Sequence, residues 1–178
     1  MITKRNRSLW LLAGFVATSL GGTLLHFLYE WTNRNILIAP FSSVNESTWE
    51  HMKLLFYPMF MFAVIQGRKF KDCKNFWCAK LAGIATGLVL IPVLFYTYNG
   101  AFGKSPNWIN IAIFFISVVL AFILETRILK TDSFQCKAPR LAFAIICLIG
   151  LVFVVFTFAT PQIQIFEDPL TGTYGVSN

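Results

Sequence analysis

Two histidines and three carboxylates lie near one another in the sequence, on either side of a short loop. They are His26, Glu30, Glu46, Glu50 and His51. Imidazole and carboxylate groups are common protein ligands of zinc, iron and manganese. The same groups can act as general acids and bases. The sequence therefore contains one cluster in which metal binding or proton transfer could take place.

The same residue types also have structural uses. Carboxylates at the start of a helix favour the helix dipole, and Glu50 could pair with Lys53 three positions later. The sequence contains no HExxH, GxSxG, P-loop or CxxC motif. A metal site, a metal-free ligand or catalytic site, and structural contacts between helices therefore all stay open. The metal candidates are His26, Glu50 and His51, and the candidates for a polar pocket are His26, Glu30, Asn45, Glu46, Trp49, Glu50 and His51.

The composition indicates which elements must position this cluster. The chain has 178 residues, of which 56% are hydrophobic and 13% are charged, whereas a soluble domain is about 25% charged. The mean hydropathy is +0.64. These values argue against a soluble globule, a disordered chain and a small disulfide-stapled protein. They predict an all-α integral membrane protein.

Five segments are expected to form membrane-spanning helices in a single domain, followed by an outer tail. The predicted spans are residues 9–30, 44–67, 81–99, 108–128 and 141–160, and the tail is 161–178. The second span is the least clear, because its uninterrupted apolar part covers only residues 54–67. Ser43 and Glu46 fit a capping box, which predicts that this helix begins near Val44.

The basic residues predict the orientation of the bundle. With five spans and the N-terminus inside, twelve of the 15 lysines and arginines fall on the inner side, and only Arg34, Lys53 and Lys104 fall outside. Such a bias indicates a cytoplasmic N-terminus, an outer C-terminus and a multi-pass protein of the plasma membrane. The net charge of +7 then requires no nucleic-acid partner. The first span also resembles a signal peptide, although its apolar run is long for one.

Small and polar residues recur every four positions in the first span, at Gly14, Thr18, Gly22, His26 and Glu30. Residues with this spacing share one helix face, so His26 and Glu30 are expected to point into the bundle. Gly83 and Gly87 predict a close helix contact in the third span. Asn110 is expected at the level of the polar cluster, and Glu125 is expected to pair with a basic residue near the inner end.

The cysteines and the tail add two further expectations. Cys73, Cys78 and Cys136 fall in predicted inner loops and Cys147 lies inside a span, so all four are expected to be free thiols in a reducing compartment. Turn signals in the tail, such as Asp168-Pro169 and Thr171-Gly172, follow the apolar residues Ile163, Ile165 and Phe166. The tail is therefore expected to be ordered and to pack over the bundle.

Two stretches resemble a known family. The run Asn45-Glu46-Ser47-Thr48-Trp49-Glu50-His51 and the ending Asp168-Pro169-Leu170-Thr171-Gly172-Thr173-Tyr174-Gly175 are similar to those of an uncharacterised family of small multi-pass membrane proteins from bacteria. The resemblance covers the whole chain. It implies a compact protein of a bacterial membrane and supplies neither an activity nor confirmed functional residues.

Three functions are compatible with these features. The first is the binding or transport of a small solute or lipid headgroup in an outward-facing polar pocket, with the bilayer as the surrounding partner. The second is a membrane-embedded hydrolase that depends on a divalent metal held by His26, His51 and a carboxylate. The third is a structural or partner subunit without catalysis. The sequence leaves the ligand, the metal and the oligomeric state open.

Overall fold

The computed structural model describes residues 4–131 and 135–176. In these residues the chain forms five α-helices, one short 3-10 helix and no strand, as the sequence predicts. The helices are α1 (Lys4–Trp31), α2 (Thr48–Gly67), α3 (Phe76–Phe102), α4 (Asn107–Lys130) and α5 (Pro139–Phe158), and the 3-10 helix is η1 (Gln164–Phe166). Four of them, α1, α3, α4 and α5, are long and apolar enough to cross a membrane.

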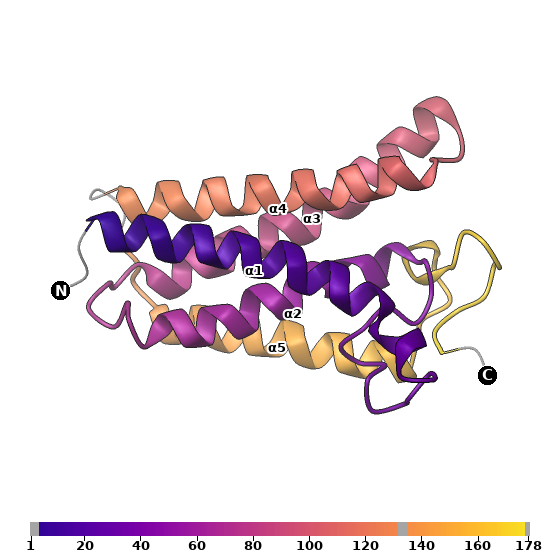
Figure 1. Cartoon of the computed structure of the whole chain (residues 1–178), viewed down its shortest axis with the longest axis horizontal. Coiled ribbons are helices and arrows are strands. Elements are labelled where there is room, and N and C mark those ends of the chain that lie inside the picture. Colours follow the sequence, from indigo (N-terminus) through magenta and orange to yellow (C-terminus); the bar gives the residue numbers. More distant parts are fainter. Residues whose placement is uncertain (1–3, 132–134, 177–178) are drawn as a thin grey trace.

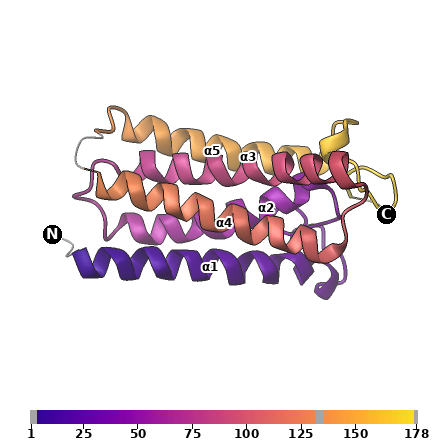
Figure 2. The same ribbon diagram turned by 90° about the horizontal axis from the view of Figure 1, so that it is seen from above.

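The five helices lie side by side and alternate in direction along the long axis (Figures 1 and 2). The end that holds the start of α1, the loop 68–75 and residues 135–138 before α5 is called the amino end below. The opposite end, called the carboxyl end, holds the loops 32–47 and 103–106 and the tail after α5. Most of the lysine and arginine positions therefore lie at the amino end of the bundle, as the predicted topology requires.

Helix α2 is the most enclosed of the helices. Half of its 20 residues are buried, and it packs against α1, α3, α4 and α5. It begins at Thr48 with Ser47 as its N-cap, four residues later than Ser43 and Glu46 suggest. The same Ser-x-x-Glu pattern occurs again at Ser47 and Glu50, and this second copy is the one that caps the helix. The helix is still about 30 Å long at 1.5 Å per residue, which matches a bilayer core.

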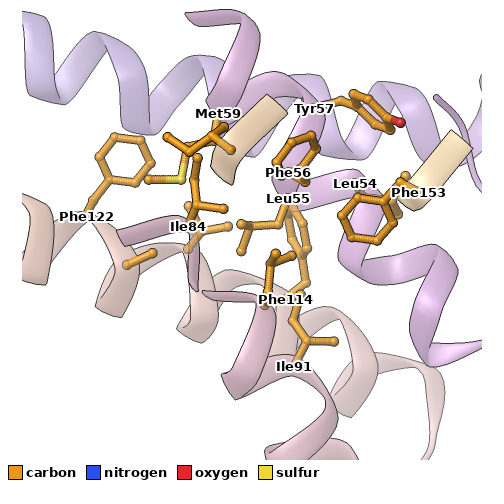
Figure 3. Packing of buried hydrophobic residues seen from close by; sticks show 14 residues of the cluster. Leu54, Leu55, Phe56, Tyr57, Met59, Ile84, Ile91, Phe114, Phe122 and Phe153 are labelled. Carbon is orange, nitrogen blue, oxygen red and sulfur yellow. The ribbon is translucent and has the colours of Figure 1, made fainter. Parts of the chain in front are cut away.

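The main apolar core is built around α2 (Figure 3). Leu55, Phe56 and Met59 have no exposed surface. Leu55 and Met59 lie against Gly87 and Gly83 of α3, and Phe56 lies against Gly150 of α5. The core continues through residues of α3, α4 and α5, which are Ile84, Leu88, Ile91, Phe114, Val118, Ala121, Phe122, Ile146 and Phe153. Side chains therefore fill the middle of the bundle between its two ends.

Two glycines allow the helices to approach closely. A Cβ atom on Gly22 of α1 would lie 2.6 Å from the carbonyl oxygen of Leu54 in α2, and one on Gly87 of α3 would lie 2.6 Å from a methyl carbon of Leu55. Both distances are shorter than a van der Waals contact. The small residues noted in the first and third predicted spans therefore mark helix contacts, as membrane proteins often use them.

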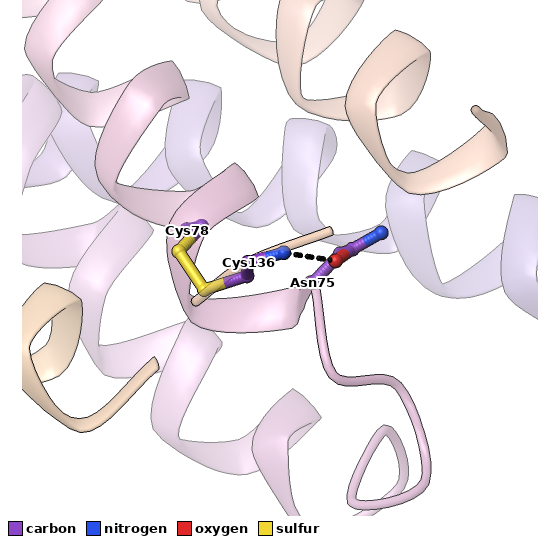
Figure 4. The surroundings of a disulfide bond; sticks show 3 residues. All are labelled: Asn75, Cys78 and Cys136. Carbon is purple, nitrogen blue, oxygen red and sulfur yellow. Dashed lines mark hydrogen bonds between the residues drawn. A yellow bond between two sulfur atoms is a disulfide. The ribbon is translucent and has the colours of Figure 1, made fainter. Parts of the chain in front are cut away.

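The structure corrects the expectation that every cysteine is free. Cys78, in the first turn of α3, forms a disulfide with Cys136, which precedes α5 (Figure 4). Cys73 and Cys147 are free thiols. The backbone N–H of Cys136 donates a hydrogen bond to the side-chain oxygen of Asn75 at 2.8 Å, and this bond holds the segment across the start of α3. A separation of 58 residues hides this proximity from the sequence.

Candidate functional site

The loop between α1 and α2 is tied down on the carboxyl end of α1. Asn33 and Arg34 have positive φ values of 53° and 58° and turn the chain back at the end of the helix. The Ser42 hydroxyl accepts a hydrogen bond from the backbone N–H of Tyr29 at 3.0 Å and donates one to the carbonyl oxygen of Leu25. The returning segment is thereby held against the last turns of α1, next to His26.

A second set of contacts fixes the start of α2. The Ser47 hydroxyl accepts a hydrogen bond from the N–H of Glu50 at 3.3 Å, and a carboxylate oxygen of Glu50 accepts one from the N–H of Val44 at 2.9 Å. The ammonium of Lys53 lies 2.6 Å from the same carboxylate oxygen. Glu50 therefore pairs with Lys53 and with the loop backbone, so the i,i+3 pairing considered from the sequence is confirmed.

Lys53 completes a fully buried polar centre. Its ammonium donates to the carbonyl oxygen of Ala39 at 2.9 Å and to the hydroxyl of Thr157 at 3.1 Å, in addition to Glu50. An ammonium group has three hydrogens, so its donors are all used. Lys53 thus joins the loop, α2 and α5 at one point, and it holds Glu50 in this centre, outside the cluster of ligand atoms described next.

His26, Glu46 and His51 form a separate group beside this centre. The Nε2 atom of His26 lies 3.7 Å from one carboxylate oxygen of Glu46, and the Nε2 atom of His51 lies 3.5 Å from the other. The two imidazole rings have centroids 5.6 Å apart. Each residue offers a ligand atom, and these three atoms all lie within 4.8 Å of one another. The structure therefore brings together both histidines, but with Glu46 in the place expected for Glu50.

The spacing of these atoms differs from that of direct hydrogen bonds. The two contacts of Glu46 with the imidazoles exceed the usual N–H···O distance of about 2.7–3.2 Å. Two ligands of one tetrahedral zinc ion are about 3.3 Å apart, since each bond is about 2.0–2.1 Å long. The observed 3.5 and 3.7 Å join different oxygens of Glu46, and one ligand atom from each residue can be chosen only within 4.8 Å of the others. The group is therefore an open cluster of ligand atoms, which would have to draw closer to surround one ion.

The tautomer of His51 also suits a ligand. Its Nδ1 atom lies 2.9 Å from the carbonyl oxygen of Ser47. A carbonyl oxygen can only accept, so Nδ1 carries the hydrogen and Nε2 of the neutral ring has a free lone pair directed toward Glu46. Metal-binding histidines are commonly oriented by a hydrogen bond of this kind. The corresponding Nδ1 atom of His26 is buried and has no hydrogen-bond partner among the described residues.

A small cavity adjoins the group. Glu46, Thr48 and His51 line one side of it, and Asn110 with apolar side chains of α3 and α4 lines the other. Its volume is about 20 Å³, which is enough for a single water molecule. Pockets for small organic ligands usually measure about 300–1,000 Å³. The space beside Glu46 and His51 therefore suits a water or a metal-bound water better than an organic solute.

The remaining predicted site residues lie elsewhere. Glu30 is exposed and pairs with Arg34 at 3.2 Å, so the expectation that it points into the bundle is wrong. One helical turn separates it from His26, and the face rotates slowly away from the bundle over that distance. Trp49 packs on Phe153 and Phe166, with ring centroids 4.6 and 4.5 Å away. It belongs to the aromatic packing beneath the tail.

Asn45 links the site to the tail. Its side-chain N–H donates to the carbonyl oxygen of Gly175 at 3.0 Å, and its side-chain oxygen accepts from the N–H of Ser47 at 2.9 Å. Phe166 is buried against the bundle, so the prediction of an ordered, packed tail is confirmed for residues up to 176. Asn45 therefore holds Glu46 in place from the side facing the tail. The role of the tail could be suspected from its turn signals, but its contact with Asn45 could not.

Comparison with known proteins gives a family and no activity. No curated protein and no solved structure matches the chain. A family of unknown function, DUF6512, matches residues 1–176. Because the match covers nearly the whole chain, the protein belongs to this DUF6512 family of unknown function.

Proposed function

We propose that this protein is a membrane metalloprotein whose bundle binds one divalent transition-metal ion through His26, Glu46 and His51. The observation that carries the proposal is the convergence of two imidazoles and one carboxylate, which offer three ligand atoms within 4.8 Å of one another and are not joined by direct hydrogen bonds. Two imidazoles and one carboxylate also form a common catalytic zinc ligand set. Iron and manganese can use the same ligand types.

The surroundings of the three residues support a fixed site. Glu46 directly follows a loop segment that Ser42 ties to α1 and Asn45 ties to the tail. His51 is oriented by Ser47 and lies in the first turn of α2. A preformed set of ligands loses less freedom when the ion binds, which favours affinity. These contacts argue for binding rather than for passage of the ion, because the apolar core fills the bundle beneath the site.

The location of the site completes the proposal. The polar group lies at the carboxyl end, opposite the basic loops. With the predicted orientation, in which the N-terminus is cytoplasmic, the metal would be accessible from the outer side of a plasma membrane. This assignment uses five spans, so it includes α2, whose polar residues are enclosed by the bundle instead of facing lipid.

A metal-binding assay on the purified full-length protein tests the proposal. The detergent-solubilised chain, with its disulfide intact, is treated with a chelator, dialysed, and titrated with Zn²⁺, Mn²⁺ and Fe²⁺ under anaerobic conditions without a thiol reductant. We expect one ion per chain, and at least tenfold weaker binding in His26→Ala, His51→Ala and Glu46→Gln. Glu30→Gln is the matched control because Glu30 lies at the same end but outside the group. Equal binding in all five proteins, or no stoichiometric binding, would overturn the proposal.

A hydrolytic reaction is the second candidate, and the water-sized cavity favours it. A metal ion held by three protein ligands keeps a position for water, and it lowers the pKa of that water. The cavity next to Glu46 and His51 has room for that molecule. Hydrolysis of a small activated ester by the zinc-loaded protein, lost in His51→Ala but retained in Glu30→Gln, is the expected result. A loaded protein without this activity would leave metal binding in a structural role.

The solute or lipid-headgroup pocket predicted from the sequence finds less support. The polar cavity at the carboxyl end is far smaller than an organic ligand needs. Binding of a single ion retains the idea of an outward-facing polar site and matches the available space. A chain with no metal and no ligand would favour the third alternative, in which the polar residues hold the helices together.

A further inference from the structure

A long groove runs between α1 and α4 at the amino end, far from the metal candidates. Its volume is about 750 Å³. Leu12 and Phe15 of α1 and Val119 and Ile123 of α4 form its apolar walls. Three of these four side chains, those of Leu12, Val119 and Ile123, are among the exposed large hydrophobic residues. The groove therefore offers a concave apolar surface on the outside of the bundle.

The mouth of the groove is basic. Arg127 and Lys130 lie there in the last turn of α4, together with the hydroxyl-bearing residues Ser8 and Thr131. Neither cation has a carboxylate within 4.0 Å among the described residues. Their position suits the negative end of the helix dipole. The helix dipole alone can explain why Arg127 and Lys130 are at this position. It does not explain why an apolar groove begins beside them.

The length of the groove matches one leaflet of a bilayer. From Val119 to Lys130 the helix rises about 16 Å at 1.5 Å per residue. Half of a hydrocarbon core is about 15 Å. The groove as a whole thus covers the depth of one leaflet. Its apolar walls lie beside the part of an acyl chain nearest the headgroup, and the two cations lie where the headgroup would be. The volume is within the range of about 300–1,000 Å³ that is usual for small-molecule sites.

We propose that this groove binds one anionic phospholipid of the leaflet at the amino end. An acyl chain lies along Leu12, Phe15, Val119 and Ile123, and the phosphate pairs with Arg127 and Lys130. Arginine is well suited to phosphate because its guanidinium donates two parallel hydrogen bonds. With the predicted orientation this is the cytoplasmic leaflet, which is rich in anionic lipids. Charge complementarity thus selects an anionic lipid over a zwitterionic one.

Thermal unfolding and native mass spectrometry of the detergent-solubilised protein test this site. The lipids are phosphatidylglycerol and phosphatidylcholine with identical acyl chains, and inorganic phosphate is the third addition. We expect phosphatidylglycerol to raise the melting temperature and to remain bound as one copy per chain. Phosphatidylcholine is expected to bind at least tenfold more weakly, and inorganic phosphate is expected to give no shift. Equal effects of the two lipids, or an equal effect of phosphate alone, would overturn the proposal.

Variants separate this groove from the general positive charge of the amino end. Arg127→Ala with Lys130→Ala should weaken phosphatidylglycerol binding at least tenfold. Lys69→Ala with Lys71→Ala removes the same charge from exposed positions at the same end and should leave binding unchanged. Val119→Trp keeps every charge, fills the apolar part of the groove, and should also weaken binding. Equal losses in the two double variants, or normal binding in Val119→Trp, would contradict the groove.

Discussion

The ammonium of Lys80 lies 2.7 Å from a carboxylate oxygen of Glu125, and neither side chain has any exposed surface. Lys80 is near the start of α3 and Glu125 is near the end of α4, so the pair joins two neighbouring helices at the amino end. The rings of Phe76 and Phe122 are centred 5.7 and 5.4 Å from the ammonium. The two charges thus depend on each other in an apolar setting.

This dependence predicts how substitutions at the pair combine. Lys80→Met or Glu125→Leu alone leaves a buried charge without its partner, which typically costs about 3–5 kcal/mol of unfolding free energy. The double variant removes both charges and restores apolar packing, so its stability should return to near that of the natural chain. Denaturant unfolding in mixed micelles measures all four proteins. A double variant as unstable as the sum of the two single variants would contradict this prediction.

The close packing of α1 on α2 predicts that alanine at Gly22 lowers stability, whereas alanine at Gly100, an open position in α3, does not. Gly22→Ala would place a Cβ 2.5 Å from a ring carbon of Phe114 and 2.6 Å from the Leu54 carbonyl oxygen. It should cost about 1–3 kcal/mol because a packed interior resists added volume. Gly100 has no atom within 4 Å of such a Cβ and serves as the control. Gly100→Ala should be neutral or stabilise α3 by up to about 1 kcal/mol.

Melting temperatures of the two glycine variants provide the comparison. A lower melting temperature in Gly22→Ala and an unchanged or higher one in Gly100→Ala would support the packing described. If both variants unfolded at the temperature of the natural chain, α1 and α2 would not approach as closely as the structure indicates.

Asn45 predicts an effect on metal affinity without direct contact with the ion. Asn45→Ala removes the hydrogen bonds to Gly175 and Ser47 and so releases the loop that carries Glu46. Loss of such supporting contacts commonly weakens metal binding about 10- to 100-fold. Tyr174→Phe is the control, because it removes only a hydrogen bond to Glu167 within the tail. Calorimetric titration with Zn²⁺ measures both, and identical affinities would remove Asn45 from the site.

The disulfide predicts a thiol count. The denatured, unreduced protein should show two reactive thiols, those of Cys73 and Cys147, and four after reduction. Cys78→Ser with Cys136→Ser should lower the unfolding free energy by about 4 kcal/mol in the chain-entropy account of a loop this long. Four thiols before reduction would contradict the bond. The count also bears on orientation, because disulfides persist in oxidising compartments whereas the basic loops favour the cytoplasm.

The fold was largely accessible from the sequence. Hydropathy placed four helices within a few residues of their observed bounds because lipid-facing helices must be apolar along their length. The start of α2 was placed four residues too early, since Ser43 and Ser47 offer the same capping pattern and only the packing of the loop selects between them. The sequence offers Arg127, Lys130 or a neighbouring basic loop as the partner of Glu125, and the partner in the structure is Lys80, near the start of α3.

The sequence indicates the region of the candidate site but not the exact set of residues that meet there. The sequence pointed to His26 and His51 but named Glu50 as their companion, whereas the structure brings Glu46 beside them. This difference depends on Lys53, whose ammonium is satisfied by Ala39 and Thr157 as well as Glu50. Thr157 is 104 residues away in the chain, and no local pattern reveals such a contact. The phospholipid groove was equally hidden, because its two walls belong to helices that are distant in sequence.

The enclosure of α2 has a consequence for biogenesis. This helix has a lysine and a glutamate buried near its start, and it is not among the four described helices that are long and apolar enough to cross a membrane. In a membrane, such a segment is retained only when its charges are paired and covered by other helices. The ammonium of Lys53 bonds to Thr157 of α5, so α2 can reach its final polar environment only after the last helix has been made.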